Sequence, residues 1–413
     1  MENVQRAIDK LYREHFGKMV AILLCSFRDF DLETAEDIVQ DSFTAALLNW
    51  SQQGIPINTK GWIYKVCRHK ALNKIKRDER IEEFSEELNA ATVETKFSES
   101  VLDDQQLKLL FACAHPDLSP KAQVVITLKY VVNLKAEAIA KVLAMSIDGV
   151  DKMLIRSRQK IKDEKILLEE PVPSALKPRL TIVHKLIYLI FNEGYKSSSG
   201  KEILREELCE EALLLNKSLM DAGLADSQTF ALHALMLFNS ARFKSRFGAS
   251  GELLDLEQQD RSLWNKELIS LGNYFHHQSQ SETISTYHIE ASIACLHCMA
   301  GNFVSTDWKT ISGLYAHLLK FNSNPFVELN YAIALYYSGQ KQTSFELLNQ
   351  LQLHPFLSQY YLLNSALGKF YHLEVDDVKA KQFLLKAYNQ TNFEKEKDFI
   401  RKMISGLNDT DGK

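Results

Sequence analysis

The sequence predicts an all-α protein built from successive helical parts. Glycine and proline are scarce, at 16 and 8 in 413 residues, which favours long helices over the many turns that strands need. Apolar residues recur at helical spacing along most of the chain, and its character changes near residues 78, 100 and 169. We therefore expect a helical domain over 1–78, an acidic linker over 79–100, a second helical domain over 101–168, and a helical-repeat extension (an α-solenoid) over 169–413.

The charges are unevenly distributed, although the formal net charge is only −4. Lysine and arginine crowd residues 60–80 and 121–165, whereas residues 79–99 and much of 202–260 are acidic. A protein that binds nucleic acid with only part of its length has this pattern. The apolar run that begins at Met19 is too short to cross a bilayer and too late for a signal peptide, so we expect a cytoplasmic protein without a membrane segment.

Six cysteines lie mostly within apolar helical pattern, as expected for free thiols in a reducing compartment. Cys295 and Cys298, and Cys113 with His115, have spacings that occur in metal sites. Neither pair has the further ligands that a metal needs. We interpret both pairs as packing residues and expect no metal, no cofactor and no catalytic residue.

The stretch 119–162 predicts a helix-turn-helix. Ser119 and Pro120 can begin a helix, and Asn133 tolerates the left-handed conformation at its end. A short helix and a tight turn follow, and then a third helix with a buried stripe at Val150, Leu154, Ser157 and Ile161. Its outer face is polar: Asp148, Gly149, Asp151, Lys152, Arg156 and Arg158. This helix suits the DNA major groove, and a plain helical hairpin with a solvated face is the alternative.

Two helices of the first domain also carry polar faces. Residues 34–50 combine an apolar stripe with an acidic-polar edge at Glu36, Asp37, Gln40 and Asp41, which could simply complement the helix dipole. Residues 59–77 interleave basic side chains with Trp62 and Tyr64, a combination that suits phosphate contacts and stacking on unpaired bases. The alternative is a solvated helix face with Trp62 in the core.

In this order, the motifs AEDIVQDSF, GWIYKVCRHKALNKIKR and LSPKAQVVITLKY…MLIRSRQKI resemble those of bacterial extracytoplasmic-function sigma factors. The resemblance implies that the helix at 34–50 docks on core RNA polymerase through Asp37, Gln40, Asp41 and Phe43. The helix at 59–77 would hold the melted minus-ten element of promoter DNA through Lys60, Trp62, Lys65, Arg68, His69 and Arg77. The helix-turn-helix would read the minus-thirty-five element with its outer face. The chain departs from the family pattern at His69, Asn73, Gly149 and Asp151, which bears on the promoter sequence more than on the activity.

The extension reads as successive amphipathic helices with short polar breaks. The pair of helices around 325–351, joined by a turn that contains glycine, resembles a tetratricopeptide unit. The motifs LIFNEGYKSS and LEQQDRSLWN resemble the sigma-factor subgroup that carries a long helical C-terminal extension. Several tyrosines of this chain's extension suit either the solenoid core or a groove for a protein partner: Tyr331, Tyr336, Tyr337, Tyr360 and Tyr361.

We therefore expect a transcription initiation factor that directs core RNA polymerase to specific promoters, with an extension that regulates it or docks a partner. The alternative is a helical-repeat one-component regulator or signalling scaffold that binds an operator without polymerase. The basic and aromatic helix at 59–77 discriminates between them, because an operator binder has no need to hold melted bases. An enzyme that uses a cavity of the repeat is a third interpretation, which no nucleophile–base pair supports.

Overall fold

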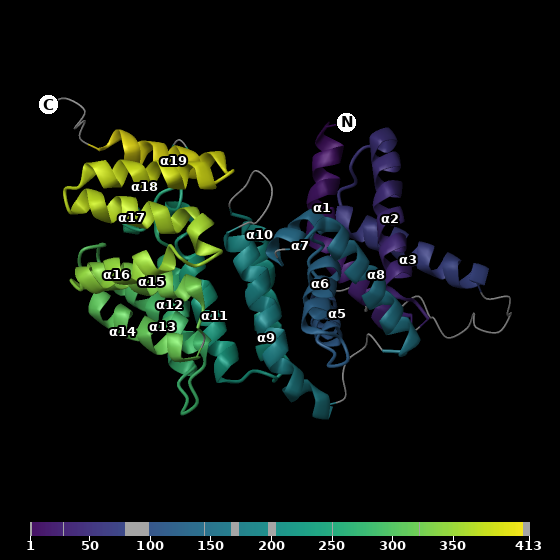
Figure 1. The fold of residues 1–413 in the computed structure, drawn as a ribbon. Coiled ribbons are helices and arrows are strands. Elements are labelled where there is room, and N and C mark those ends of the chain that lie inside the picture. Colours follow the sequence, from purple (N-terminus) through teal and green to yellow (C-terminus); the bar gives the residue numbers. More distant parts are fainter. Residues whose placement is uncertain are drawn as a thin grey trace. The chain divides into compact units, whose positions relative to one another are not determined.

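The computed structural model describes residues 2–27, 29–78, 99–143, 145–166, 173–196, 204–249, 251–321 and 323–407. In these ranges the regular elements are helices, apart from an isolated β-bridge between Phe247 and Leu253. The chain forms two compact units, Met1–Ala225 and Asp226–Lys413 (Figure 1). The all-α prediction is confirmed.

The helices of the first unit are α1 (Glu2–Ser26), α2 (Leu32–Gln53), α3 (Thr59–Asp78), α5 (Glu99–Cys113), α6 (Pro120–Tyr130), α7 (Ala136–Val142), α8 (Ile147–Asp163), α9 (Pro173–Tyr195) and α10 (Glu206–Asp221). The predicted acidic linker at 79–100 lies outside the described residues, except for its last two residues, which begin α5. Helix α1 packs against α2, α3 and α5, so α1 joins the first predicted domain to the second.

The helix-turn-helix forms as the capping residues predict. The Ser119 hydroxyl accepts a hydrogen bond from the Ala122 amide, with Pro120 at the first helical position of α6. Asn133, after α6, has φ of 53°. The Ser146 hydroxyl accepts from the Gly149 amide and begins α8. The buried residues of α8 are the four that the sequence places on its inner stripe.

The first unit extends further along the chain than the expected boundary at residue 169. Beyond that boundary α9 begins at Pro173, and Pro178 lies inside this helix. Helices α9 and α10 both pack on α5. The Arg179 guanidinium also donates to the Phe111 carbonyl oxygen at 3.1 Å, which ties α9 to the end of α5.

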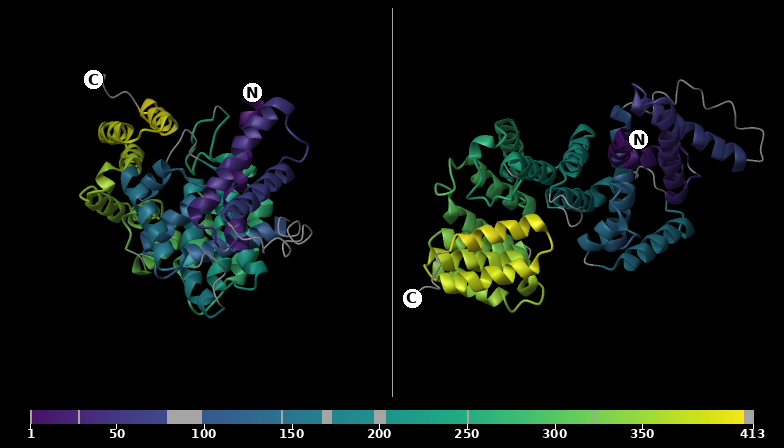
Figure 2. Two further views of the ribbon diagram at one scale, coloured as in Figure 1. Left: turned by 90° about the vertical axis from the view of Figure 1, so that its right-hand side faces the viewer. Right: turned by 90° about the horizontal axis from the view of Figure 1, so that it is seen from above.

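The second unit contains α11 (Ser227–Ser240), α12 (Lys266–Gln278), α13 (Thr286–Met299), α14 (Trp308–Phe321), α15 (Pro325–Tyr337), α16 (Lys341–Leu351), α17 (Tyr361–Leu373), α18 (Asp377–Gln390) and α19 (Glu394–Ser405). Short 3₁₀ turns lie at Phe243–Ser245, Arg261–Leu263 and Leu357–Gln359. From α13 onward each helix packs on the next, which is solenoid-like packing. Figure 2 shows α17, α18 and α19 stacked side by side, in yellow.

The two most regular helix pairs, α15–α16 and α17–α18, have equivalent turns. Gly339 has φ of 91° and Val375 has φ of 64°, and both residues follow the last turn of the first helix of their pair. The expected glycine turn is thus confirmed in the first pair, whereas a valine takes the left-handed position in the second.

The tyrosines of the extension belong mainly to its core. The ring of Tyr336 stacks on Phe370 with centroids 3.7 Å apart, and its hydroxyl donates to Glu374 at 2.6 Å. Tyr361 is buried and donates to Glu396. The solenoid core, rather than a docking groove, therefore accounts for these two residues.

The close approach of α1 to the end of α6 gives a first prediction. A Cβ added at Gly17 would lie 1.9 Å from the Val131 carbonyl oxygen, and Gln106 already donates to that oxygen at 3.1 Å. Gly17→Ala should therefore force the helices apart and cost about 1–3 kcal/mol. Hydrogen exchange should show protection in α1 and α5 reduced by about 5–150-fold.

The control is Gly313→Ala, because Gly313 is an exposed residue inside α14 with open space around its Cα. Alanine favours helix by up to about 1 kcal/mol, so protection of α14 should stay equal or rise. Unchanged protection of α1 and α5 in Gly17→Ala would show that this contact does not hold the helices together.

Candidate functional site

Helix α2 presents an exposed acidic-polar edge. The Asp31 carboxylate accepts a hydrogen bond from the Thr34 amide at 2.8 Å and so begins the helix. One turn later Asp37, Gln40 and Asp41 are exposed, which places them where a partner could contact them. Phe43 differs from its expected position: it is buried and packs edge-on against Tyr12, so it belongs to the core.

Helix α3 has a basic face that is open to solvent. Lys65, His69, Asn73 and Lys76 are exposed and follow one another at helical spacing, and Lys60 and Arg77 are exposed at the two ends of the helix. Arg68 is half-buried. These residues carry much of the predicted nucleic-acid face.

The aromatic residues of α3 divide between surface and core. Trp62 is half-buried, with its ring packed edge-on against Trp50 at a centroid distance of 5.4 Å. Tyr64 was expected on the outer face, but it is buried and its hydroxyl lies 3.2 Å from the His15 Nδ1. Trp62 is thus the aromatic side chain of α3 that retains an exposed part.

Four of the six residues expected on the outer face of α8 are exposed. Asp148, Asp151, Lys152 and Arg156 are exposed, and Gly149 is half-buried. Lys152 and Asp148 form a surface ion pair at 2.8 Å, which the side chains can exchange for other partners at little cost. Arg158 instead turns inward, because it follows the buried Leu154 by one helical turn and its long side chain reaches α2.

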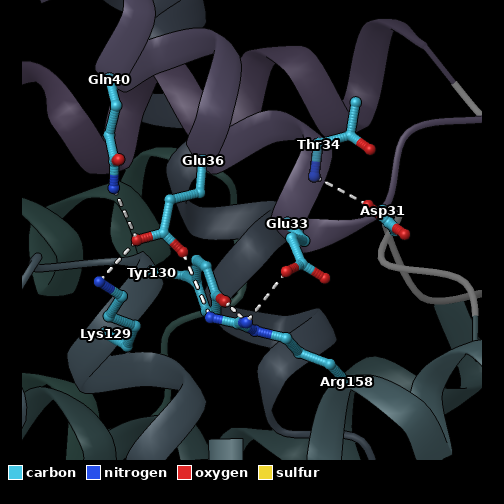
Figure 3. Close-up of polar contacts among 8 residues, drawn as sticks. All are labelled: Asp31, Glu33, Thr34, Glu36, Gln40, Lys129, Tyr130 and Arg158. Atoms are coloured by element: carbon cyan, nitrogen blue, oxygen red, sulfur yellow. Dashed lines mark hydrogen bonds and ion pairs between the residues drawn. The ribbon is translucent and has the colours of Figure 1, made fainter. Parts of the chain in front are cut away.

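Arg158 joins a polar cluster between α2, α6 and α8, which Figure 3 shows. The Arg158 Nε donates to the Tyr130 hydroxyl oxygen at 2.6 Å, and its terminal nitrogen lies 3.4 Å from the Glu36 carboxylate. The Lys129 Nζ lies 2.6 Å from the other Glu36 oxygen. We call Glu36, Lys129, Tyr130 and Arg158 the Glu36 cluster.

Burial strengthens these contacts, because little water competes for the charges. The Glu36 side chain is only 9 % exposed, and Arg158 is 25 % exposed. Burial alone would lower the pKa of Arg158, but Tyr130 and Glu36 outweigh it and raise that pKa. Burial also raises the pKa of Tyr130, so its hydroxyl stays neutral and accepts from Arg158.

The Glu36 cluster reaches the exposed edge of α2 through Gln40. The Gln40 Nε2 donates to Glu36 at 3.0 Å. Gln40 also hydrogen-bonds to Tyr12, whose pKa is raised by burial and by the charge of Glu36. The polar edge of α2 and Arg158 of α8, which the sequence treats as parts of separate faces, are therefore connected by hydrogen bonds through Glu36.

The role of Glu36 was missed from the sequence, which placed it on the exposed edge. A signal was present: Glu36 follows Leu32 by four residues and precedes Val39 by three, so it stands on the buried stripe of α2. A carboxylate in such a position needs a cationic partner. Its partners lie on α6 and α8, far along the chain, and periodicity within α2 could not identify them.

In the described part of the chain, no three His, Cys, Asp or Glu side chains come together as metal ligands. None of the helices in the described ranges has the length and apolar character needed to cross a membrane.

The comparisons place part of the chain near sigma factors. Residues 179–280 match a family model described as a family of unknown function (DUF6596). The chain is 26 % identical to RNA polymerase sigma factor YlaC of Bacillus subtilis (strain 168) over 164 residues, which cover 38 % of this chain and 90 % of that protein. The chain thus contains a sigma-factor-like region. No solved structure matches.

A longer match covers most of the chain. It is 32 % identical over 325 residues to a protein of Rhizobium meliloti (strain 1021) named "Uncharacterized protein R00370", and the match covers 76 % of this chain and 75 % of that protein. The chain therefore belongs to the same protein family as R00370 of Rhizobium meliloti.

Proposed function

We propose that the chain is a transcription initiation factor that binds core RNA polymerase through α2 and promoter DNA through α3 and α8. The observation that carries the proposal is that two helices of one unit, α3 and α8, each present exposed basic side chains, and that α2, which precedes both in sequence, presents an exposed acidic-polar edge. The similarity to a protein named as an RNA polymerase sigma factor supports it.

In this proposal the protein acts by position rather than by covalent chemistry. The basic face of α3 would contact phosphates, and the exposed part of Trp62 would stack on an unpaired base of the minus-ten element. The outer face of α8 would enter the major groove at the minus-thirty-five element, as the second helix of a helix-turn-helix does. Polymerase would gain the base recognition that it lacks.

The proposal is tested by run-off transcription with purified core polymerase and a library of genomic fragments. Defined transcripts that depend on the added protein would support it. The alternative, an operator-binding regulator, predicts retention of particular fragments by the protein alone and no new transcript. That second result would contradict the initiation role.

The exposed edge of α2 gives a prediction for polymerase binding. Asp41 is exposed, and its ion pair with Lys70 at 3.8 Å is worth less than about 1 kcal/mol, so Asp41→Lys should leave the fold intact. We expect at least about a tenfold loss of affinity for core polymerase, or about 1.4 kcal/mol. Co-purification and fluorescence anisotropy measure it.

Glu282→Lys is the control for this prediction, because it reverses an equally exposed carboxylate in the second unit. Its affinity for polymerase should match the wild type. Equal affinities of the Asp41 and Glu282 variants, with matched circular dichroism, would remove Asp41 from the proposed contact.

Helix α8 gives a prediction for DNA. Arg156 is exposed. If it contacts a phosphate, Arg156→Ala should weaken binding to all promoters alike and lower the salt slope by about one. If it contacts a base, the loss should be about 1–3 kcal/mol and confined to promoters with that base.

The exposed Lys266 on α12 provides a matched control, because Lys266→Ala removes one exposed cation from the second unit. Salt titrations of DNA binding compare the two variants. Arg156→Ala curves that overlay those of Lys266→Ala would mean that α8 does not face DNA.

We also propose that the second unit regulates the factor or docks a protein partner. The compact units divide after Ala225, and α9 and α10 pack on α5, so a truncation should follow Ala225 rather than the end of α8. The fragment 1–225 should keep helical circular dichroism and DNA binding, while its transcript yield should differ from that of the full chain by severalfold. Equal yields on the same promoter would contradict a regulatory role.

A further inference from the structure

We infer that the first unit is a closed form of the protein, which Glu36 latches by holding the helix-turn-helix against α2. This inference rests on the proposed function, because it concerns how two DNA-binding faces of one unit become available. In the closed form, Arg158, which the sequence assigns to DNA, is paired with residues of the protein. The exposed faces of α3 and α8 also lie too close together to reach both promoter elements.

The two promoter elements lie further apart than the first unit is wide. The minus-ten and minus-thirty-five elements lie about 25 base pairs apart, which is about 85 Å along B-DNA at about 3.4 Å per base pair. The first unit comprises Met1–Ala225. A compact body of that size has a radius of gyration of about 17 Å and is about 45 Å across. Helices α3 and α8 of one such body cannot occupy both elements together.

Arg158 already has partners within the protein. Its guanidinium is engaged by the Tyr130 hydroxyl and by the carboxylates of Glu36 at 3.4 Å and Glu33 at 3.7 Å. A phosphate or a base edge would have to displace these partners. The Arg158 position that the sequence assigns to DNA is therefore satisfied within the protein until α8 leaves α2.

The latch function falls to Glu36 rather than to Glu33. Glu36 is nearly buried and binds cations of both α6 and α8, whereas Glu33 is 67 % exposed and reaches Arg158 alone. Neutralising a buried carboxylate leaves Lys129 and Arg158 half-buried without their counter-charge, which strongly disfavours the closed form. Neutralising an exposed carboxylate changes little.

Gln40 connects the latch to the surface proposed to bind polymerase. Its amide donates to Glu36, and it lies on the exposed edge with Asp37 and Asp41. A partner that takes up the Gln40 amide removes one of the hydrogen bonds that fix the Glu36 carboxylate. Polymerase binding at α2 and release of the helix-turn-helix would thus be linked.

Helix α1 packs on α5, and Gly17 of α1 lies close to the Val131 carbonyl oxygen at the end of α6, so further contacts support the closed form from the other side. Apolar packing is largely insensitive to a competing polar partner, whereas a charge cluster can exchange its partners. The Glu36 cluster is therefore the part of the closed contact that a polar partner such as DNA or polymerase can undo.

The test is single-molecule energy transfer between dyes introduced at Ser51 on α2 and Lys141 on α7, both exposed. The free full-length protein should show one compact population. Glu36→Gln should raise the ratio of open to closed molecules at least about tenfold, and Glu33→Gln, the matched control, less than about twofold. Lys129→Met is the second variant, and it should open the protein as Glu36→Gln does.

The outcomes separate the latch from the proposed function. A Glu36→Gln protein that is folded by circular dichroism but stays compact, together with a compact Lys129→Met protein, overturns the latch whatever the transcription assay shows. Opening by both variants supports the latch even if no transcript depends on the protein. Equal opening by Glu33→Gln and Glu36→Gln would also overturn the assignment, because burial would then make no difference.

Discussion

A carboxylate withdrawn from water determines how the first unit is assembled. Glu36 stands on the buried stripe of α2, and a charge in that position is tolerated only when cations and hydrogen-bond donors surround it. Lys129, Arg158 and Gln40 supply them (Figure 3). Because two of these partners come from α6 and α8, satisfying one charge on α2 also fixes where the helix-turn-helix lies. Replacing a buried ion pair by apolar residues is often neutral or stabilising, so we interpret the Glu36 cluster as fixing one arrangement of these helices.

For the proposed function, the consequence is a balance between two uses of the same side chains, one within the protein and one on DNA. An arginine suits a phosphate or a guanine edge for the reason that it suits a carboxylate, since its planar donors match both. A DNA-binding helix can therefore be held by an internal acid until DNA or another partner competes. The exposed residues of α8, such as Arg156, are free of this constraint and remain available for a first contact.

Much of the local structure followed from the sequence, and the contacts across the chain did not. Caps at Ser119 and Ser146 and the stripe on α8 depend on neighbours within one or two turns, so periodicity and capping rules predicted them. The inward turn of Arg158 and the burial of Tyr64 depend on distant helices.

The measurement that tests the account most directly is promoter cleavage by an iron chelate tethered to the protein in a complex with polymerase. One sample carries the chelate at Asn73 on α3 and the other at Gln159 on α8, both exposed positions. The account predicts two cleavage centres about 25 base pairs apart, which requires the first unit to open. Centres within about 13 base pairs of each other, the reach of a closed unit about 45 Å across, would contradict it.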